Sequence, residues 1–334
     1  MSTQSSDVLE ELTGSRDSKQ AILLANVHKL RASSAVMDRE NPLHADLRQY
    51  VPGTGAKEPK PAKPEERFVA LEHVVSLLGE QSVVDEPLYL LLQGGTGSGK
   101  SALLRYLEYT LWSQHDSDNE QLVPLFISLA QLADPEHQAV EETMASCGVS
   151  AQGIAQLKAT CRFVFLLDGF DELGKPVNLY HSNSLSTWNA HVIVGARSQY
   201  LQSLSEYSSL FTTPKQSAVN ERFLLPFEPD QVDLYLQRFA LSSESSEADW
   251  RAYRQLIDAT PGLLDLVTTP FLLRMACISY TSLKQGVPSE GLTRCLTKSV
   301  LYDTFLEIML QRELWRCVSR RLLHPTVLLA CGAP

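Results

Sequence analysis

Residues 94–101 combine the residue types and the spacing that bind a phosphate chain. The segment reads Gly-Gly-Thr-Gly-Ser-Gly-Lys-Ser and fits the pattern G-x-x-x-x-G-K-[ST]. Glycines allow the backbone to curl so that successive N–H groups face an anion, and a helix start adds the positive end of its dipole. In this pattern Lys100 reaches the β- and γ-phosphates, and the Ser101 hydroxyl is a ligand for Mg²⁺. The predicted phosphate-binding residues are Gly94, Gly95, Thr96, Gly97, Ser98, Gly99, Lys100 and Ser101.

The sequence on either side of this loop is typical of the strand–loop–helix unit in which the pattern has meaning. The apolar run at 88–92 predicts a buried parallel strand. Leucines at 103, 104, 107 and 111 predict one face of an amphipathic helix. A glycine-rich turn that only joins a strand to a helix is the alternative, and the agreement between loop and flanks favours the phosphate loop.

A second group of candidate residues follows the apolar run at 163–167. Asp168 directly follows that run, so it is predicted at the carboxyl end of a buried strand, the edge where doubly wound sheets bind ligands. We expect Asp168 to hold Mg²⁺, directly or through water. Asp171 and Glu172 lie on the adjoining loop, and Glu172 is the candidate that polarises an attacking water. The alternative is an acidic turn that only caps a core strand.

Another buried strand is predicted over residues 191–196, and it ends at Arg197. An arginine at this edge of the sheet could contact the γ-phosphate and report its presence. A surface salt bridge is the alternative role for Arg197. Two more strands are predicted at 122–129 and 222–225, and Pro124 indicates an edge position for the first of them.

The predicted fold class is α/β, a P-loop NTPase with a mainly parallel five-stranded sheet flanked by helices, followed by a small all-helical domain. Helices are predicted near Ile22–Leu30, from Phe68 to Leu78 with Gly79 ending it, and over 134–158 with a break near Gly148. The expected domains are a polar segment with a short helix and a Pro/Lys-rich linker (1–66), a nucleotide-binding domain (67–226), a helical domain (227–314) and an irregular tail (315–334).

Composition limits the classes of partner and the cellular compartment that we expect for this chain. The 334 residues carry a formal net charge of -10 without a basic stripe, so nucleic acid is not an expected partner. Six scattered cysteines without a CxxC pair argue against zinc and a disulfide framework, and they suit a reducing, cytoplasmic location. No apolar run approaches the roughly 20 residues of a membrane span, and the first residues lack a secretory signal pattern.

Taken together, the motifs resemble NACHT-domain proteins, which belong to the STAND class of P-loop NTPases. The resemblance covers roughly residues 67–315, and the D-G-F-D-E run at 168–172 is its most specific part. Residues 269–273, Thr-Pro-Phe-Leu-Leu, look like the family segment whose proline contacts the nucleotide. The motifs that carry the resemblance are 94–101, 166–173, 194–197, and 225–227 with Gln231 and Tyr235.

The resemblance implies particular roles for these residues. Lys100 and Ser101 would bind phosphates and Mg²⁺, and Asp168 would serve the metal. Asp171 and Glu172 would complete the acidic catalytic site, Arg197 would be the sensor arginine, and Pro270 would touch the nucleotide base or sugar. The family's sheet order would place the Arg197 strand between those of Lys100 and Asp168. ATP or ADP is the implied nucleotide, and no N-K-x-D signature for guanine is present.

The function implied is an ATP-binding, slowly hydrolysing switch with weak ATPase activity, acting in signalling such as innate immunity through protein partners or self-association. The winged-helix domain, repeat sensor and effector domain of family members are not recognisable, so we expect a fragment or a short member. Two alternatives stay open. One is a nucleotide-stabilised interaction module without turnover, and the other is a P-loop small-molecule kinase, for which no Arg-rich lid is visible.

Overall fold

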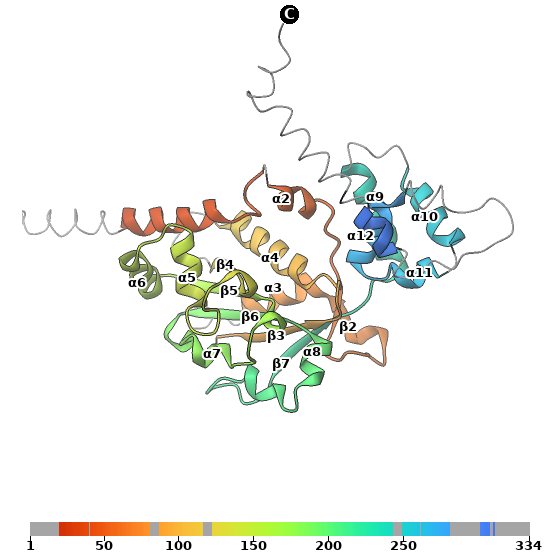
Figure 1. Ribbon diagram of the computed structural model, residues 1–334. Helices are drawn as coiled ribbons and strands as arrows, with labels where there is room; N and C mark the ends of the chain where they lie inside the picture. Colours follow the sequence, from red (N-terminus) through yellow and green to blue (C-terminus); the bar gives the residue numbers. More distant parts are fainter. Residues whose placement is uncertain are drawn as a thin grey trace, which may run out of the picture. The chain divides into compact units, whose positions relative to one another are not determined.

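The computed structural model describes residues 20–39, 41–80, 87–115, 122–242, 249–260, 262–280, 301–307 and 310 (Figure 1). The chain divides into two compact units, Met1–Pro226 and Phe227–Pro334. Within the described residues, no helix has both the length and the apolar composition to cross a bilayer.

The first unit is built around a seven-stranded sheet in the order β2-β1-β7-β3-β6-β5-β4. Strands β3 to β7 pair in parallel, which confirms the predicted α/β class and these five strands. The antiparallel strands β1 and β2 extend the sheet, so it has seven strands rather than the predicted five. Strand β6 lies between β3 and β5, as the resemblance implies, and β4 with Pro124 is an edge strand. The strands are β1 Thr54–Ala56, β2 Arg67–Val69, β3 Tyr89–Gly94, β4 Leu122–Ser128, β5 Arg162–Asp168, β6 Ala190–Arg197 and β7 Asn220–Leu224.

Strand β1 lies in the part of the chain, 41–66, whose composition predicts a linker, and β2 follows directly after that part. Strand β1 pairs antiparallel with β2 on one side and with β7 on the other. Gly55 and Ala56 are buried there, whereas the Pro/Lys-rich residues between the strands are exposed. The prediction of an extended linker is therefore wrong for these residues, because three-residue strands are too short to leave a periodic pattern.

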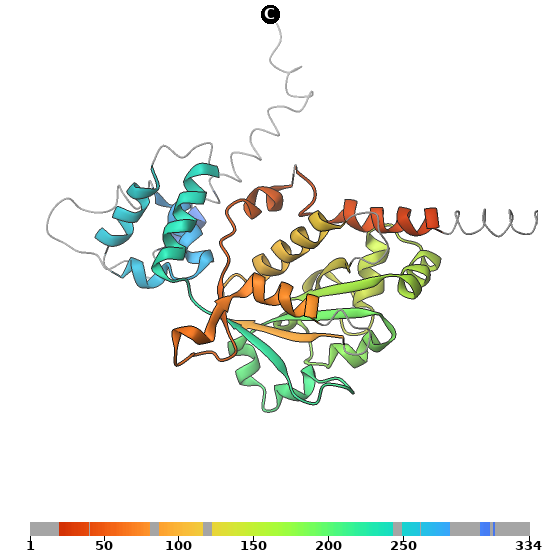
Figure 2. The ribbon, with the colours of Figure 1, turned by 180° about the vertical axis from the view of Figure 1, so that it is seen from behind.

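Helices cover both faces of this sheet. Figure 2 shows α3 and α4, orange and yellow, on the face seen from behind.

The predicted helix boundaries differ from the observed ones in places. Phe68 belongs to β2 rather than to the predicted helix, and Gly79 lies inside α3 rather than after it. The predicted break near Gly148 is confirmed, since its φ of 78° ends α5. The helices of this unit span residues 20–33, α2 Pro42–Leu47, α3 Ala70–Glu80, α4 Lys100–Gln114, α5 Ala139–Ser146, α6 Ala151–Thr160, α7 Leu179–Ser182 and α8 Ser198–Ser203; short 3₁₀ turns span η1 Pro64–Glu66, η2 Leu129–Gln131, η3 Phe170–Glu172, η4 Leu185–Thr187 and η5 Tyr207–Phe211.

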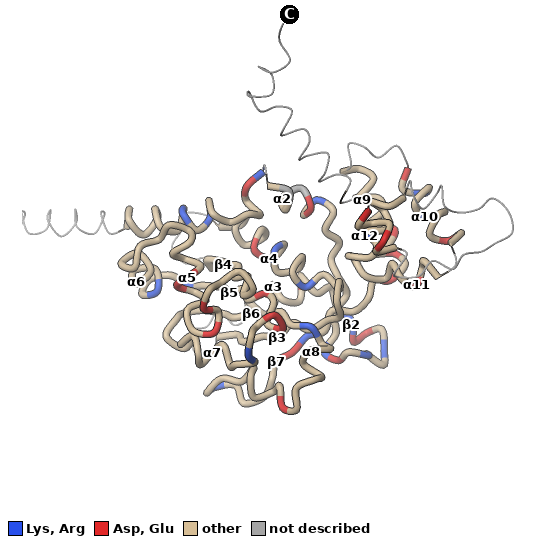
Figure 3. Tube along the Cα trace, in the orientation of Figure 1, with Lys and Arg blue, Asp and Glu red and all other residues tan. Residues whose placement is uncertain are grey.

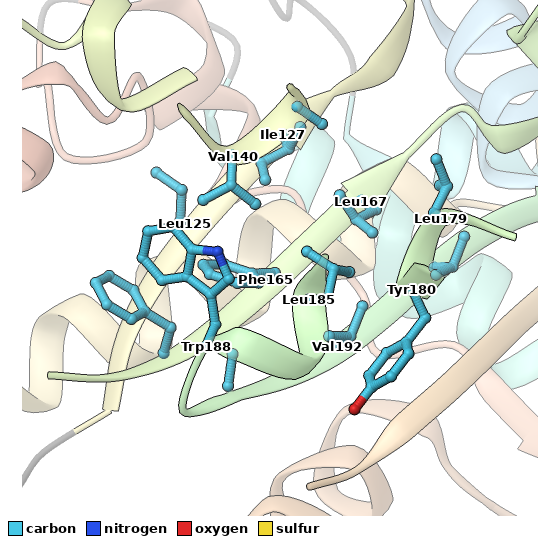
Figure 4. Packing of buried hydrophobic residues seen from close by; sticks show 14 of the residues in the cluster. Leu125, Ile127, Val140, Phe165, Leu167, Leu179, Tyr180, Leu185, Trp188 and Val192 are labelled. Carbon is cyan, nitrogen blue, oxygen red and sulfur yellow. The ribbon is translucent and has the colours of Figure 1, made fainter. Parts of the chain in front are cut away.

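The parallel strands are apolar on both faces, because each face packs against helices. On one face Leu125, Phe165 and Val192 pack with Trp188, whose ring meets that of Phe165 edge-on at 5.4 Å (Figure 4). Alternate residues such as Leu166 face the opposite core, which the leucines of α4 fill. A sheet fixed from both sides holds its strand ends rigidly, and these ends carry the candidate residues.

The second unit is helical throughout its described part. Its helices are α9 Pro229–Ser242, α10 Trp250–Ala259, α11 Leu263–Leu266, α12 Pro270–Ile278 and a helix over 301–307. The rings of Phe239 on α9 and Tyr253 on α10 meet edge-on at 5.8 Å. The predicted irregular tail at 315–334 lies outside the described residues.

Burial of His191 in β6 predicts a pH dependence of stability. Its Nδ1 accepts a hydrogen bond of 3.0 Å from the Leu88 N–H, and burial, with the nearby charge of Arg162, lowers the pKa of His191 to about 4. The unfolded chain binds a proton near pH 6.5, whereas the folded chain resists it until about pH 4. Stability is therefore full above pH 6.5, and the free energy of unfolding should fall by roughly 2 to 3 kcal/mol between pH 6.5 and 4.

Chemical denaturation of the wild type and of His191→Gln at pH 7.0, 5.5 and 4.5 measures this loss. The variant should lose less stability over the same range, while His28→Gln, at an exposed histidine, should follow the wild type. Equal pH dependence in all three proteins would contradict the assignment to His191.

Candidate nucleotide-binding site

The phosphate loop joins the carboxyl end of β3 to the first turn of α4. Gly94 ends the strand and Lys100 begins the helix. Gly97 and Gly99 have φ angles of 75° and 94°, in the left-handed region that glycine adopts without strain. The start of α4 therefore faces the loop with its free N–H groups, the arrangement that binds anions at helix starts.

Lys100 lies against the loop that it is predicted to serve. Its amine donates hydrogen bonds to the carbonyl oxygens of Gly94 (2.9 Å) and Gly95 (3.0 Å). Burial lowers the pKa of Lys100, and the carboxylates of Asp171 and Asp168 oppose that shift. The buried Ser98 hydroxyl has no hydrogen-bond partner within the part of the chain that the structure describes. A phosphate group would supply an acceptor to both side chains.

Asp168 is the last residue of β5, as predicted, and lies beside the start of α4. The Ser101 hydroxyl is close enough to the Asp168 carboxylate to lower its pKa. Burial raises the pKa of Asp168, while Ser101, Lys100 and Arg105 lower it. Gly195 is the residue opposite Asp168 on β6, and a Cβ atom there would lie 3.2 Å from Asp168 Oδ1. The glycine therefore leaves room for the carboxylate.

The donor set at this point fits Mg²⁺. A hydroxyl and a carboxylate, from Ser101 and Asp168, are the hard oxygen ligands that Mg²⁺ prefers. In the described ranges no group of three or more His, Cys, Asp or Glu side chains could hold a metal by itself. Phosphate oxygens and water would have to complete the coordination, which is the usual arrangement for Mg²⁺ bound with a nucleotide.

Arg197 ends β6 and is bound to both acids of the adjoining turn. Its backbone N–H donates to Asp171 Oδ1 (2.9 Å), and its Nε lies 2.9 Å from Asp171 Oδ2. A longer contact of 3.5 Å joins the Arg197 guanidinium to Glu172 Oε1. The Asp171 side chain is only 7% exposed, against 47% for Glu172. Figure 3 shows acidic and basic positions together at this edge of the sheet.

Strand register brings the predicted residues together. Arg197 pairs with Gly94 across β6 and β3, and Gly195 pairs with Asp168 across β6 and β5. Consistent with this alignment, the charges of Asp168, Asp171 and Arg197 all act on Lys100. The predicted groups of Lys100, Asp168 and Arg197 therefore lie at or just after the ends of three adjacent strands, as expected. Pro270 begins α12 in the second unit, and its contact with a nucleotide stays a prediction.

Two residues beside the site are not part of any motif. Arg105 lies on α4 one helical turn beyond Ser101, and its charge acts on Asp168. The spacing of four residues on a helix could have indicated it. The Gln199 amide nitrogen would lie 3.6 Å from a Cβ atom at Gly95, so this side chain borders the loop. No sequence pattern singles out Gln199.

Comparison with solved structures finds low similarity. The chain is similar to the ORC2 protein of Aeropyrum pernix in its ADPNP and ADP complexes (11% identity, TM-score 0.43, covering 75% of this chain and 69% of that one). It is also similar to the RuvB branch-migration motor of Thermotoga maritima (16%, 0.38, 71% and 66%) and to domain III of the T. maritima replication initiator DnaA (14%, 0.42, 72% and 90%). With TM-scores below 0.5, these similarities support no conclusion about function.

No curated protein matches the sequence. The comparison with protein families does give a match, to the NACHT domain over residues 88–239. The matched region begins just before the phosphate loop, contains Asp168, Asp171, Glu172 and Arg197, and ends within α9. The range covers every motif on which the predicted resemblance depends except the segment at 269–273, which lies beyond it. Residues 88–239 are therefore similar to a NACHT domain, which is consistent with a NACHT-domain P-loop NTPase, and they include the five parallel strands of the sheet.

Proposed function

We propose that this protein binds ATP or ADP with Mg²⁺ at the end of β3 and acts as a slowly hydrolysing signalling switch. The observation that carries the proposal is the alignment of Lys100, Asp168 and Arg197 at three neighbouring strand ends. A triphosphate could reach an amine, a carboxylate and a guanidinium there without any large movement of the sheet. The same motifs at separate places in the fold would not bring these three groups to one triphosphate.

In this proposal each group has a separate task. The loop N–H groups and Lys100 bind the phosphates, while Ser101 and Asp168 would hold the metal. Bound Mg²⁺ would supply positive charge to the β- and γ-phosphate oxygens. Glu172 is half-exposed and so can orient a water molecule toward the γ-phosphate. Asp171 has both oxygens on Arg197, so we assign it to positioning that arginine rather than to proton transfer.

The switch depends on Arg197. In the structure its guanidinium is paired with Asp171 and Glu172. A γ-phosphate would compete for the same guanidinium and release Glu172, so ATP and ADP would favour different arrangements at this edge. A ligand shifts an equilibrium only by its difference in affinity for the two states, and this exchange is the proposed source of that difference. In the cytoplasm, protein partners or other copies of the chain would bind one of the two states in preference to the other. Pro270 would contact the nucleotide.

One observation favours the alternative of an interaction module without turnover. Glu172 contacts Arg197 at 3.5 Å, and an acid held by that pair is not available to activate water. In that case the nucleotide would be a structural ligand that stabilises the folded domain.

Analysis of the nucleotide released from purified, denatured protein tests the proposal. We expect ADP or ATP in a molar amount close to that of the protein, or binding of added Mg·ATP by a preparation that contains none. Recovery of no nucleotide together with no calorimetric binding of ATP or ADP would overturn it.

Replacing Arg197 by alanine should reduce the preference of the site for ATP over ADP. The guanidinium can reach a γ-phosphate that ADP lacks, so we expect ATP affinity to fall about 10-fold and ADP affinity to change by less than about 2-fold. Calorimetric titration of both nucleotides measures the two affinities. Arg251→Ala, at an exposed arginine on α10, is the control. An unchanged ratio of affinities would contradict a sensor role.

A further inference from the structure

Ser128 ends β4 directly beside the predicted metal ligand Asp168. Strands β4, β5 and β6 lie side by side (Figure 1), and their register places Ser128 opposite Asp168 on one side and Gly195 opposite it on the other. Neighbouring strands are about 4.8 Å apart, and paired residues project to the same face of the sheet. The Ser128 hydroxyl and the Asp168 carboxylate are therefore lateral neighbours at the edge that carries the candidate site.

The face that these two residues share is the one that packs against α4. On β5, Leu166 belongs to the core cluster that contains the leucines of α4, and Asp168 is the next residue on that side. On β4, Phe126 packs against the same cluster, and Ser128 follows it in the same way. Ser101, the other predicted metal ligand, lies in the first turn of α4. All three polar residues thus belong to one face of the sheet.

The Ser128 hydroxyl is not used for the local task that its position would allow. Ser128 is the N-cap residue of the short turn η2, where a serine side chain usually accepts a hydrogen bond from a backbone N–H of the first turn. Here the side chain makes no capping hydrogen bond. The residue is half-buried, so its hydroxyl stays within reach of water. The hydroxyl is therefore available to a ligand at this edge.

An apolar series on β4 ends at this serine. Leu122 and Phe126 pack against the cluster beneath α4, whereas Ser128 is small and polar, so β4 contributes no apolar side chain beside Asp168. On the other side, a Cβ atom at Gly195 would lie 3.2 Å from Asp168 Oδ1. The carboxylate thus has a serine and a glycine as lateral neighbours, and both are small enough to leave space for water.

We propose that Ser128 is a positioning residue whose hydroxyl binds a water molecule of the Mg²⁺ ion and so stabilises the metal beside Asp168. This inference rests on the proposed function, because it concerns the metal that accompanies the nucleotide. Mg²⁺ gives up water reluctantly and usually keeps several molecules, so protein groups that bind these waters help to fix its position. The hydroxyl is uncharged and serves only the metal, so nucleotide affinity without metal should not depend on it.

Calorimetry on the full chain tests the proposal with two titrations. ATP is added once in excess EDTA and once in excess Mg²⁺, and the ratio of the two affinities measures what the metal contributes to binding. We expect Ser128→Ala to lower this ratio about 10-fold, the lower end of the usual effect of losing a group behind the metal ligands. Affinity for ATP in EDTA should stay within about 2-fold of the wild type.

Matched variants separate the hydroxyl from a general loss of structure. Ser128→Thr keeps the hydroxyl on a residue that suits a strand, so it should restore most of the ratio. Ser146→Ala removes an exposed hydroxyl at the end of α5 and should leave the ratio unchanged. An unchanged ratio in Ser128→Ala, or an equal loss in Ser128→Thr, would overturn the proposal. Wild-type protein that binds no ATP in EDTA or in Mg²⁺ would instead count against the proposed function.

Discussion

Replacement of Lys100 by alanine is expected to abolish measurable nucleotide binding. The amine is hydrogen-bonded to the carbonyl oxygens of Gly94 and Gly95 in the loop, where the β- and γ-phosphates would bind. Losing the charge-assisted hydrogen bonds that the amine would make to these phosphates should cost about 3 to 4 kcal/mol, or a loss on the order of 100- to 1,000-fold in affinity. Calorimetric titration with Mg·ATP and with ADP measures this loss.

The fold itself should tolerate this change. The two carbonyl oxygens that Lys100 contacts can hydrogen-bond to water instead, so the melting temperature without nucleotide should shift little. Lys175→Ala, at an exposed lysine beyond the acidic turn, is the matched control and should bind nucleotide as the wild type does. Binding of ATP by the Lys100 variant with wild-type affinity would refute the assignment of the loop.

The parallel part of the sheet could be predicted from sequence because each strand is buried on both faces. A short continuous apolar run such as 163–167 has the length and composition of a strand buried on both faces, and the acid that follows it fits the carboxyl edge of a parallel sheet. Pro124 correctly indicated an edge strand, because an edge leaves one side of the backbone without ladder partners. The place of β6 between β3 and β5 came from the family resemblance, since no local pattern encodes the order of strands.

Features that depend on contacts between distant segments could not be predicted. Strand β1 has only three residues within a polar, proline-rich stretch, and it exists because β7 and β2 pair with it. Arg105 is one of several charged residues on α4 until Phe126 and the buried Glu108 are known to contact it. Local sequence patterns do not contain such contacts.

The structure adds a physical reason for giving the two adjacent acids different roles. The sequence already favoured Glu172 as the residue that polarises water, but it assigned no separate role to Asp171. The structure distinguishes them, because Asp171 is buried against Arg197 and Glu172 is half-exposed. A general base needs access to water, whereas a group that orients an arginine needs a fixed geometry. On these grounds Glu172 is the better candidate for turnover.

Replacement of Glu172 by glutamine is therefore expected to lower phosphate release from ATP by about 100- to 1,000-fold, the usual effect of losing a positioned general base. Glutamine retains the size and the polar contacts of the side chain but cannot accept the proton of the attacking water. ATP affinity should change by less than about 3-fold, because in the proposed site the loop and Lys100 would bind most of the phosphate oxygens. Single-turnover phosphate release with protein in excess over ATP measures the rate.

The control is Glu136→Gln, since Glu136 is an acid beside Gly174 that is not aligned with the phosphate loop. Its rate should match that of the wild type. A wild-type rate at background, unchanged by either substitution, would reject turnover and leave the nucleotide as a structural ligand. A wild-type rate above background that survives in the Glu172 variant would instead place the general base elsewhere. The exposed carboxylate would then serve only to pair with Arg197, and the γ-phosphate could still act through that arginine without Glu172 taking part in the chemistry.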